Sequence, residues 1–269
     1  MISRSDAGLA RPGAIIAYRR PGTGPPLLLL HATLSSSRQL RPLADRLAAR
    51  FSVLGVDRRG SGASAPADGE VASALDVAVH VDDLVAILDA EQIGPCFVVG
   101  HSYGGCLGLE LAARQPRRVR AVWAYEPPYA PLAPPDAREQ LADVGRLTLE
   151  AGAQGGSEAA ADAFFESVAG AHALASLSPA ARAGIHREGG AAIVEAPLLG
   201  LEADGLAGIV CPVRIATGTL SSPWYAPIAE ALVERIRGAT HDRIERADHG
   251  APITDPAVIA ASILGFAAP

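Results

Sequence analysis

The chain of 269 residues contains no lysine and no asparagine, so its cationic side chains at neutral pH are arginines. The formal net charge is −6, and no basic run is present to meet nucleic-acid phosphates, so we expect no nucleic-acid partner. The first residues lack an apolar signal core, and no apolar stretch reaches the length of a membrane span. These absences predict a cytoplasmic protein with no membrane partner.

Cysteine is scarce as well. Cys96, Cys106 and Cys211 are odd in number, scattered, and placed in or beside apolar patterns. Their spacing fits neither a disulfide framework nor a metal site, so we expect them to behave as small buried apolar residues. The sequence gives no reason to expect a metal or an organic cofactor.

The chain is rich instead in strand and helix signals that alternate. Apolar runs predict strands near residues 14–18, 27–30, 52–56, 96–99, 119–125, 213–216 and 242–246. Apolar residues at helical spacing fall between most of these strands, near residues 40–47, 77–88, 228–236 and 258–266, and a helical pattern also follows Ser102 directly. This alternation predicts an α/β fold with a mostly parallel sheet covered by helices on both faces. Only turn residues separate the first two strands, which predicts a hairpin or two adjacent strands.

Residues 131–208 interrupt the alternation. They are rich in alanine and glycine, with apolar residues at helical spacing and no strand-like run. We predict an α/β core of residues 1–130 and 209–269 and a helical cap of residues 131–208, lying over the open end of the sheet where ligands of such folds bind. A disordered linker is disfavoured because the apolar content is too high.

The most informative motif is Gly100-His101-Ser102-Tyr103-Gly104, a G-x-S-x-G pattern between an apolar strand and a helical pattern. A serine at such a tight turn is lifted clear of the sheet, and bulk at either glycine would clash across the turn. The following helix directs backbone N–H groups toward developing negative charge. The motif predicts that Ser102 is a nucleophile; the alternative is a polar turn.

Two further loops carry a family resemblance. His31-Ala32-Thr33 follows a strand, and Asp57-Arg58-Arg59-Gly60-Ser61-Gly62-Ala63-Ser64 matches a D-x-R-G-x-G-x-S loop. With the serine motif, they make the chain resemble the α/β-hydrolase superfamily, in its capped esterase and lactonase branch, from His31 to the C-terminal helix. The resemblance implies an oxyanion hole made by the backbone N–H groups of Thr33 and Tyr103, although Ala32 replaces the usual glycine. It also implies bracing roles for His31, His101, Asp57 and Arg58.

The resemblance assigns the base to His249, which follows the last strand pattern and precedes a C-terminal helix. The family usually places an acid three residues after the glycine that ends the preceding strand, but here Gly218 is followed by Ser221 at that position. Some members carry the acid at the end of the strand after the nucleophile, which is the place of Glu126. We therefore predict Glu126 as the acid; a Ser–His dyad and a cap carboxylate are the alternatives. Asp248 would point away from the ring.

These residues predict a serine hydrolase that cleaves a carboxylic ester or lactone of a small apolar substrate through an acyl-enzyme. Phe164, Phe165 and Trp224 are expected to line the substrate site, and the cap shows no arginine cluster to hold a phosphate. Hydrolysis of a C–C bond, cofactor-free perhydrolysis and a non-catalytic binding role are alternatives. A haloalkane dehalogenase is disfavoured because its nucleophile is a carboxylate. The substrate's identity and the oligomeric state stay open.

Overall fold

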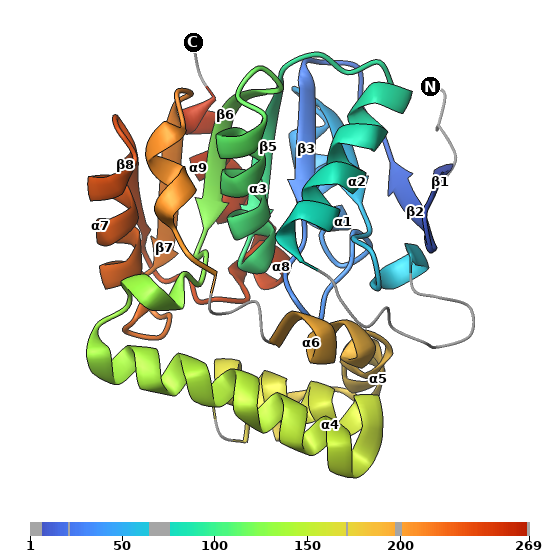
Figure 1. Ribbon diagram of the computed structural model, residues 1–269, viewed down its shortest axis with the longest axis vertical. Coiled ribbons are helices and arrows are strands. Elements are labelled where there is room, and N and C mark those ends of the chain that lie inside the picture. The colour runs from blue at the N-terminus through green and yellow to red at the C-terminus, as the bar shows by residue number, and fades with distance from the viewer. Residues whose placement is uncertain (1–6, 21, 65–75, 171, 197–200, 268–269) are drawn as a thin grey trace.

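The computed structural model describes residues 7–20, 22–64, 76–170, 172–196 and 201–267. Their strands form one eight-stranded sheet in the order β1-β2-β4-β3-β5-β6-β7-β8 (Figure 1). The strands are β1 (Ala7–Arg11), β2 (Ala14–Arg19), β3 (Pro26–Leu30), β4 (Ser52–Val56), β5 (Cys96–His101), β6 (Val119–Tyr125), β7 (Val213–Gly218) and β8 (Thr240–Ile244). Every pairing from β4 to β8 along this order is parallel, and only β1 and β2 at one edge are antiparallel, which confirms the predicted α/β fold.

Helices cover both faces of the sheet. The helices of the two layers are α1 (Arg41–Leu47), α2 (Val77–Ala90), α3 (Tyr103–Arg114), α7 (Tyr225–Arg235), α8 (Ala251–Thr254) and α9 (Pro256–Phe266). One large apolar cluster joins α2, α3 and α7 to the sheet, and a second joins α1, α8 and α9 to its other face. The central strands read as unbroken apolar runs because both of their faces are buried.

The expected pairing of the first two predicted strands is wrong. β2 pairs with β1, which the sequence did not predict, and with β4, whereas β3 lies between β4 and β5. The turn residues before β3 pack against the end of α1 instead of forming a tight hairpin. A Cβ on Gly24 would lie 1.9 Å from the carbonyl oxygen of Arg50. The turn before β3 can therefore pass this close to the segment between α1 and β4 only because residue 24 is glycine.

Within the described ranges, three α-helices lie between β6 and β7: α4 (Pro135–Ala169), α5 (Pro179–Arg187) and α6 (Gly189–Glu195). Figure 1 shows these inserted helices as a separate layer beyond one end of the sheet. α4 is interrupted at Gly156, whose φ is +75°. A small apolar cluster containing Phe164 and Ile185 of this layer also includes Leu34, from the loop after β3. The inserted layer therefore packs on the carboxyl end of the strands; the boundaries of a cap at residues 131 and 208 stay a prediction.

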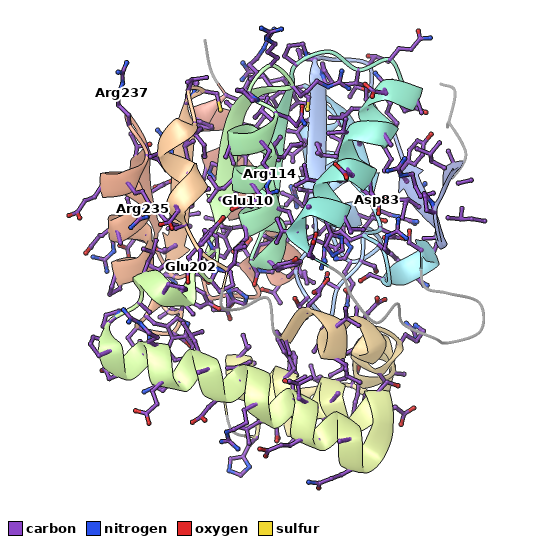
Figure 2. All side chains as sticks on the ribbon, in the orientation of Figure 1. Asp83, Glu110, Arg114, Glu202, Arg235 and Arg237 are labelled. Carbon is purple, nitrogen blue, oxygen red and sulfur yellow. The ribbon has the colours of Figure 1, made fainter. Side chains whose placement is uncertain are left out.

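A buried ion pair fixes the loop after β4. Arg59 donates from Nε and Nη2 to the two carboxylate oxygens of Asp83, at 2.8 Å each, and Arg11 of β1 donates to the same carboxylate at 3.0 Å. Figure 2 labels Asp83 on α2, and Glu110 and Arg114 on α3. In the described ranges, no helix is both long and apolar enough to cross a membrane.

Candidate active site

Backbone strain gathers at the carboxyl edge of the sheet. Leu34, Ser102 and Glu126 have positive φ values of 55°, 53° and 49°, and they follow β3, β5 and β6. L-residues rarely adopt this region, and such outliers persist where the surrounding structure holds them, often at functional sites. The three strand ends lie side by side in the sheet, because β5 pairs with both β3 and β6.

Ser102 occupies a turn with no room for side chains on its flanking glycines. A Cβ on Gly100 would lie 2.2 Å from the carbonyl oxygen of Gly104, and one on Gly104 would lie 2.6 Å from that of His31. The Ser102 N–H donates to the carbonyl oxygen of Tyr125 at 2.7 Å, which ties the turn to the end of β6. Ser102 is the residue that precedes the first turn of α3, so its hydroxyl stands at a helix N-terminus.

Glu126 and His249 come together from distant parts of the chain. Oε2 of Glu126 lies 2.6 Å from Nδ1 of His249, and Oε1 accepts the N–H of Gly218 at 2.8 Å. Glu126 is only 1% exposed, and both of its carboxylate oxygens are engaged by these contacts. Because Nδ1 faces the carboxylate, the Nε2 atom of His249 is the ring nitrogen left for a reacting group.

Three neighbours hold His249 in place. Its ring stacks on Tyr225 with centroids 4.8 Å apart and an interplanar angle of 5°, a contact that no sequence motif indicated. Its carbonyl oxygen accepts from Nε2 of His101 at 2.8 Å, and Tyr125 donates to the carbonyl oxygen of Asp248 at 2.7 Å. Burial lowers the pKa of His101 well below its usual range, so this ring is a neutral donor.

His101 also connects the histidine to the serine turn. It directly precedes Ser102, and its ring centroid lies 4.9 Å from that of His249. Within the described ranges no hydrogen bond joins Oγ of Ser102 to the His249 ring. The structure therefore brings Glu126 and His249 into contact and Ser102 beside them, and catalytic hydrogen bonds that are loose in a free site commonly tighten when a substrate binds.

The two N–H groups expected to form an oxyanion hole are unused. Neither Thr33 nor Tyr103 donates its backbone N–H to another described residue. Tyr103 is the first residue of α3, where a backbone N–H has no acceptor within the helix. The close approach of Gly104 to the carbonyl oxygen of His31 brings the loop after β3 against the start of α3. Both donors thus belong to segments in direct contact.

Sequence reasoning missed the contact that ties α6 to this loop. Arg58 and Glu195, each 2% exposed, form an ion pair, and a second guanidinium nitrogen of Arg58 lies 3.3 Å from the other oxygen of Glu195. Oγ1 of Thr33 donates to Glu195 at 2.5 Å, and Arg58 also donates to the carbonyl oxygens of His31 and Ala32 at 3.2 and 3.1 Å. The last residue of α6 therefore anchors the loop that carries the Thr33 N–H.

The residues that were expected to brace the site lie around this loop. Nε2 of His31 accepts the N–H of Arg58 at 3.0 Å, and burial lowers the pKa of the His31 ring, which keeps the ring neutral. Asp57 accepts the N–H groups of Ser37 and Ala63 at 2.7 and 3.0 Å. His31, His101, Asp57 and Arg58 therefore all make contacts that hold backbone near the site.

The predicted substrate-lining residues divide into two groups. Phe164 is buried beside Leu34, and Phe165 packs on the same cluster. Trp224 lies next to Tyr225, with ring centroids 5.9 Å apart, and packs on the core instead. Their contact with substrate stays a prediction. In the part of the chain that the structure describes, no group of three or more His, Cys, Asp or Glu side chains is placed to hold a metal ion.

Comparison with known proteins agrees with this geometry. Residues 25–175, more than half of the chain, match the model of the alpha/beta hydrolase fold family. The chain belongs to the α/β-hydrolase family. A solved α/β hydrolase from Sphaerobacter thermophilus is similar over 97% of this chain and 99% of its own, with a TM-score of 0.70 and 27% identity. The enol-lactonase from Burkholderia xenovorans LB400 shares the fold, with a TM-score of 0.75 and 22% identity over 97% of this chain and 99% of its own.

Similarity to curated sequences is partial. This α/β hydrolase is 34% identical to a 2-(acetamidomethylene)succinate hydrolase from Mesorhizobium japonicum over 134 residues, which are 49% of this chain and 46% of that protein. The matches to the first curated relatives span less than half of the length of those relatives. The comparisons therefore establish the family and the fold, and they do not assign the specific reaction.

We predict that Gly100→Ala destabilises the fold. Its Cβ would meet backbone atoms that cannot move aside, so we expect unfolding free energy to fall by at least about 2 kcal/mol. Gly265→Ala is the matched control, because a Cβ at that exposed position of α9 meets nothing within 4 Å and should be neutral or stabilising. Chemical denaturation of both variants measures the difference, and equal stability would contradict the close packing of the turn.

We predict that Glu195→Ala lowers the unfolding free energy by about 3–5 kcal/mol, because Arg58 would remain buried without its charge partner. Glu150→Ala, which removes one of the two carboxylate partners of Arg146 where the side chains are about half exposed, should change the unfolding free energy little. The double variant Arg58→Met/Glu195→Leu should recover much of the loss, since no charge stays buried. Similar losses for Glu195→Ala and Glu150→Ala would refute the buried pair.

Proposed function

We propose that this α/β hydrolase cleaves a carboxylic ester or a lactone through an acyl-enzyme formed on Ser102. The observation that carries the proposal is the bond between the buried Glu126 carboxylate and Nδ1 of His249, beside a serine held in strained geometry at a helix N-terminus. A serine hydroxyl is a poor nucleophile without a base, and an imidazole oriented by a carboxylate is the base that such a site requires.

The first half of the reaction forms the acyl-enzyme. Nε2 of His249 takes the proton of Ser102 as Oγ attacks the carbonyl carbon, and the carbonyl oxygen gains negative charge. The N–H groups of Thr33 and Tyr103 donate to this oxyanion. The tetrahedral intermediate collapses when its C–O bond to the leaving group breaks, and the imidazolium returns the proton to the departing alkoxide oxygen.

The second half regenerates the serine. A water molecule gives its proton to His249 as its oxygen attacks the acyl carbon. The new tetrahedral intermediate then releases the carboxylic acid as its bond to Oγ of Ser102 breaks, and the imidazolium returns the proton to Oγ. In a lactone the leaving alcohol and the acid belong to one molecule. During both halves the Glu126 carboxylate stabilises the imidazolium, and this interaction is strong because the carboxylate is almost completely buried.

The surroundings of the site favour a small substrate with an apolar part. The inserted helices meet the carboxyl edge of the sheet through an apolar cluster that includes Leu34, next to the proposed Thr33 donor, and Phe164. An acyl or alcohol group that packs here would displace water from around the reacting carbonyl. Glu195, a positioning residue in this proposal, fixes the Thr33 loop through its side chain.

The decisive experiment combines covalent labelling with a substrate panel. A fluorophosphonate should label the wild-type protein on Ser102, and Ser102→Ala should fold normally, resist labelling and lose at least about a thousandfold in kcat/KM. The panel holds p-nitrophenyl esters of increasing chain length and several lactones; we expect higher kcat/KM for apolar esters than for acetate. A variant within about tenfold of wild type would exclude Ser102 as the nucleophile, and a wild-type protein that is neither labelled nor active on the panel would leave a binding role.

We predict that Glu126→Gln lowers kcat by about two to four decades with little change in KM. Gln would still accept the Gly218 N–H but would turn an N–H₂ group toward Nδ1 of His249, which disfavours the required tautomer. Ser221→Ala, at the position where the family usually has its acid, is the control and should change kcat little. Near-normal turnover by Glu126→Gln would show that the acid lies elsewhere or that a dyad suffices.

A further inference from the structure

A separate hollow lies between the sheet edge and the inserted helices. Its volume is about 700 Å³, and its lining comes from β2, the loop after β3, the start of α1, the loop after β4 and the junction of α5 with α6. Ser102, Glu126 and His249 are not among the residues that line it. We call it the arginine pocket, after its charged residues: Arg19, Arg38, Arg41 and Arg187, with Asp57 and Glu188.

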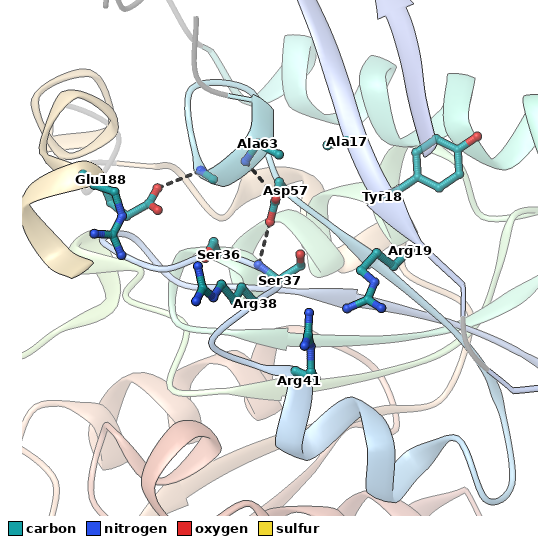
Figure 3. A pocket seen from close by; sticks show the side chains of 12 residues that line it. Ala17, Tyr18, Arg19, Ser36, Ser37, Arg38, Arg41, Asp57, Ala63 and Glu188 are labelled. Atoms are coloured by element: carbon teal, nitrogen blue, oxygen red, sulfur yellow. Dashed lines mark hydrogen bonds between the residues drawn. The ribbon is translucent and has the colours of Figure 1, made fainter. Parts of the chain in front are cut away.

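The charge of this pocket is opposite to that of the whole protein. Four arginines face two carboxylates there, whereas the chain carries a net charge of −6. Figure 3 shows Arg19, Arg38 and Arg41 along one side of the hollow and Asp57 and Glu188 along the other. Arg187 adds a fourth guanidinium from the inserted helices.

Three of the four arginines are not paired with the acids beside them. In the described ranges, Arg38, Arg41 and Arg187 make no ion pair and no side-chain hydrogen bond. Asp57 instead binds two backbone N–H groups of its own loop, those of Ser37 and Ala63. Arginine guanidinium groups present paired donors that match the geometry of carboxylate and phosphate oxygens.

Glu188 is a weak counter-charge. It accepts the N–H of Gly62 at 2.9 Å and is buried. Desolvation, reinforced by the Asp57 carboxylate and opposed by the Gly62 N–H and by Arg58 and Arg187, raises its pKa to about 7. Near neutral pH a fraction of Glu188 is therefore uncharged, which leaves the pocket more positive than its residue count indicates.

We propose that the arginine pocket binds a small molecule that carries a carboxylate or phosphate group, held between arginines of the core and Arg187 of the inserted layer. The volume suits a compact organic anion, and the open side lets the ligand keep part of its hydration. Because Arg187 ends α5 and Glu188 precedes α6, the bound anion fastens the inserted layer to the sheet edge. This site is independent of the reaction proposed at Ser102.

The test measures thermal stabilisation of the whole protein by sodium sulfate and by sodium succinate at millimolar concentrations, with ionic strength held constant by sodium chloride. A ligand that binds only the folded state raises Tm, and above its Kd the rise grows with the logarithm of the ligand concentration. We expect such a rise in the wild type with at least one of the two anions, and the comparison between sulfate and succinate shows which oxyanion chemistry the pocket prefers.

Matched variants decide whether the rise in Tm comes from an anion bound in the arginine pocket. Arg38→Ala/Arg41→Ala should weaken the apparent affinity by at least about tenfold, since two of the donors are lost. Arg46→Ala is the control: Arg46 is an exposed arginine of α1 that does not line the pocket, and its loss should leave the affinity unchanged. Equal stabilisation of all three proteins, or none in the wild type, would overturn the proposal.

Measuring the affinity for sulfate over a series of pH values tests whether the charge of Glu188 weakens anion binding. Sulfate keeps its charge through this range, so a change in its affinity reports a change in the protein. Protonation of Glu188 removes a negative charge from the pocket, and we expect sulfate to bind more tightly as the pH falls through about 7. Glu188→Gln should bind tightly at both ends of the series, and a pH dependence that survives this substitution would rule out the role of Glu188.

Discussion

The close approach of two backbone segments is the constraint on which the site depends. The turn from β5 to α3 and the loop after β3 touch at Gly100, Gly104 and His31, with no space for a Cβ on either glycine. This contact sets the positive φ of Ser102 beside the start of α3 and presses the loop carrying Thr33 against the same place. Strain of this kind costs stability locally and is held by the surrounding core.

The inserted helices contribute to this edge through charge as well as apolar packing. Burying the Arg58–Glu195 pair carries a desolvation penalty, so the pair is poor evidence for added stability. Its additional bonds to Thr33 and to the carbonyl oxygens of His31 and Ala32 fix the loop in one geometry. α6 spans seven residues, about 10 Å, with Glu188 just before it and Glu195 at its end. One short helix thus links the arginine pocket to the proposed oxyanion loop.

Local pattern was enough to predict much of the fold and Ser102, whereas the resemblance to the α/β-hydrolase family led to Glu126 and His249. Ser102 stands in a motif whose glycines have a steric reason, and Glu126 and His249 each follow a strand, so parallel pairing alone brings them to one edge. The contacts that sequence reasoning missed join separate segments of the chain: Glu195 pairs with Arg58, and Tyr225 stacks on His249. Arg187 and Arg38, which line the same pocket, also come from distant segments. The wrong prediction for β3 has a similar cause. The turn residues between β2 and β3 do not show that β4, which comes later in the chain, lies between these two strands in the sheet.

The ends of β6 and β7 both contribute to the position of the acid. In this chain the end of β7 carries no carboxylate, yet Gly218 donates its N–H to Glu126 from the neighbouring strand. Gly218 can do so only as glycine, since a Cβ there would lie 2.2 Å from the carbonyl oxygen of Ala247. The strand end that lacks the acid therefore orients the acid of β6, and the second carboxylate oxygen is left to face His249. A carboxylate fixed at one oxygen has little freedom to rotate away from the imidazole, which favours the single tautomer that the proposed reaction needs.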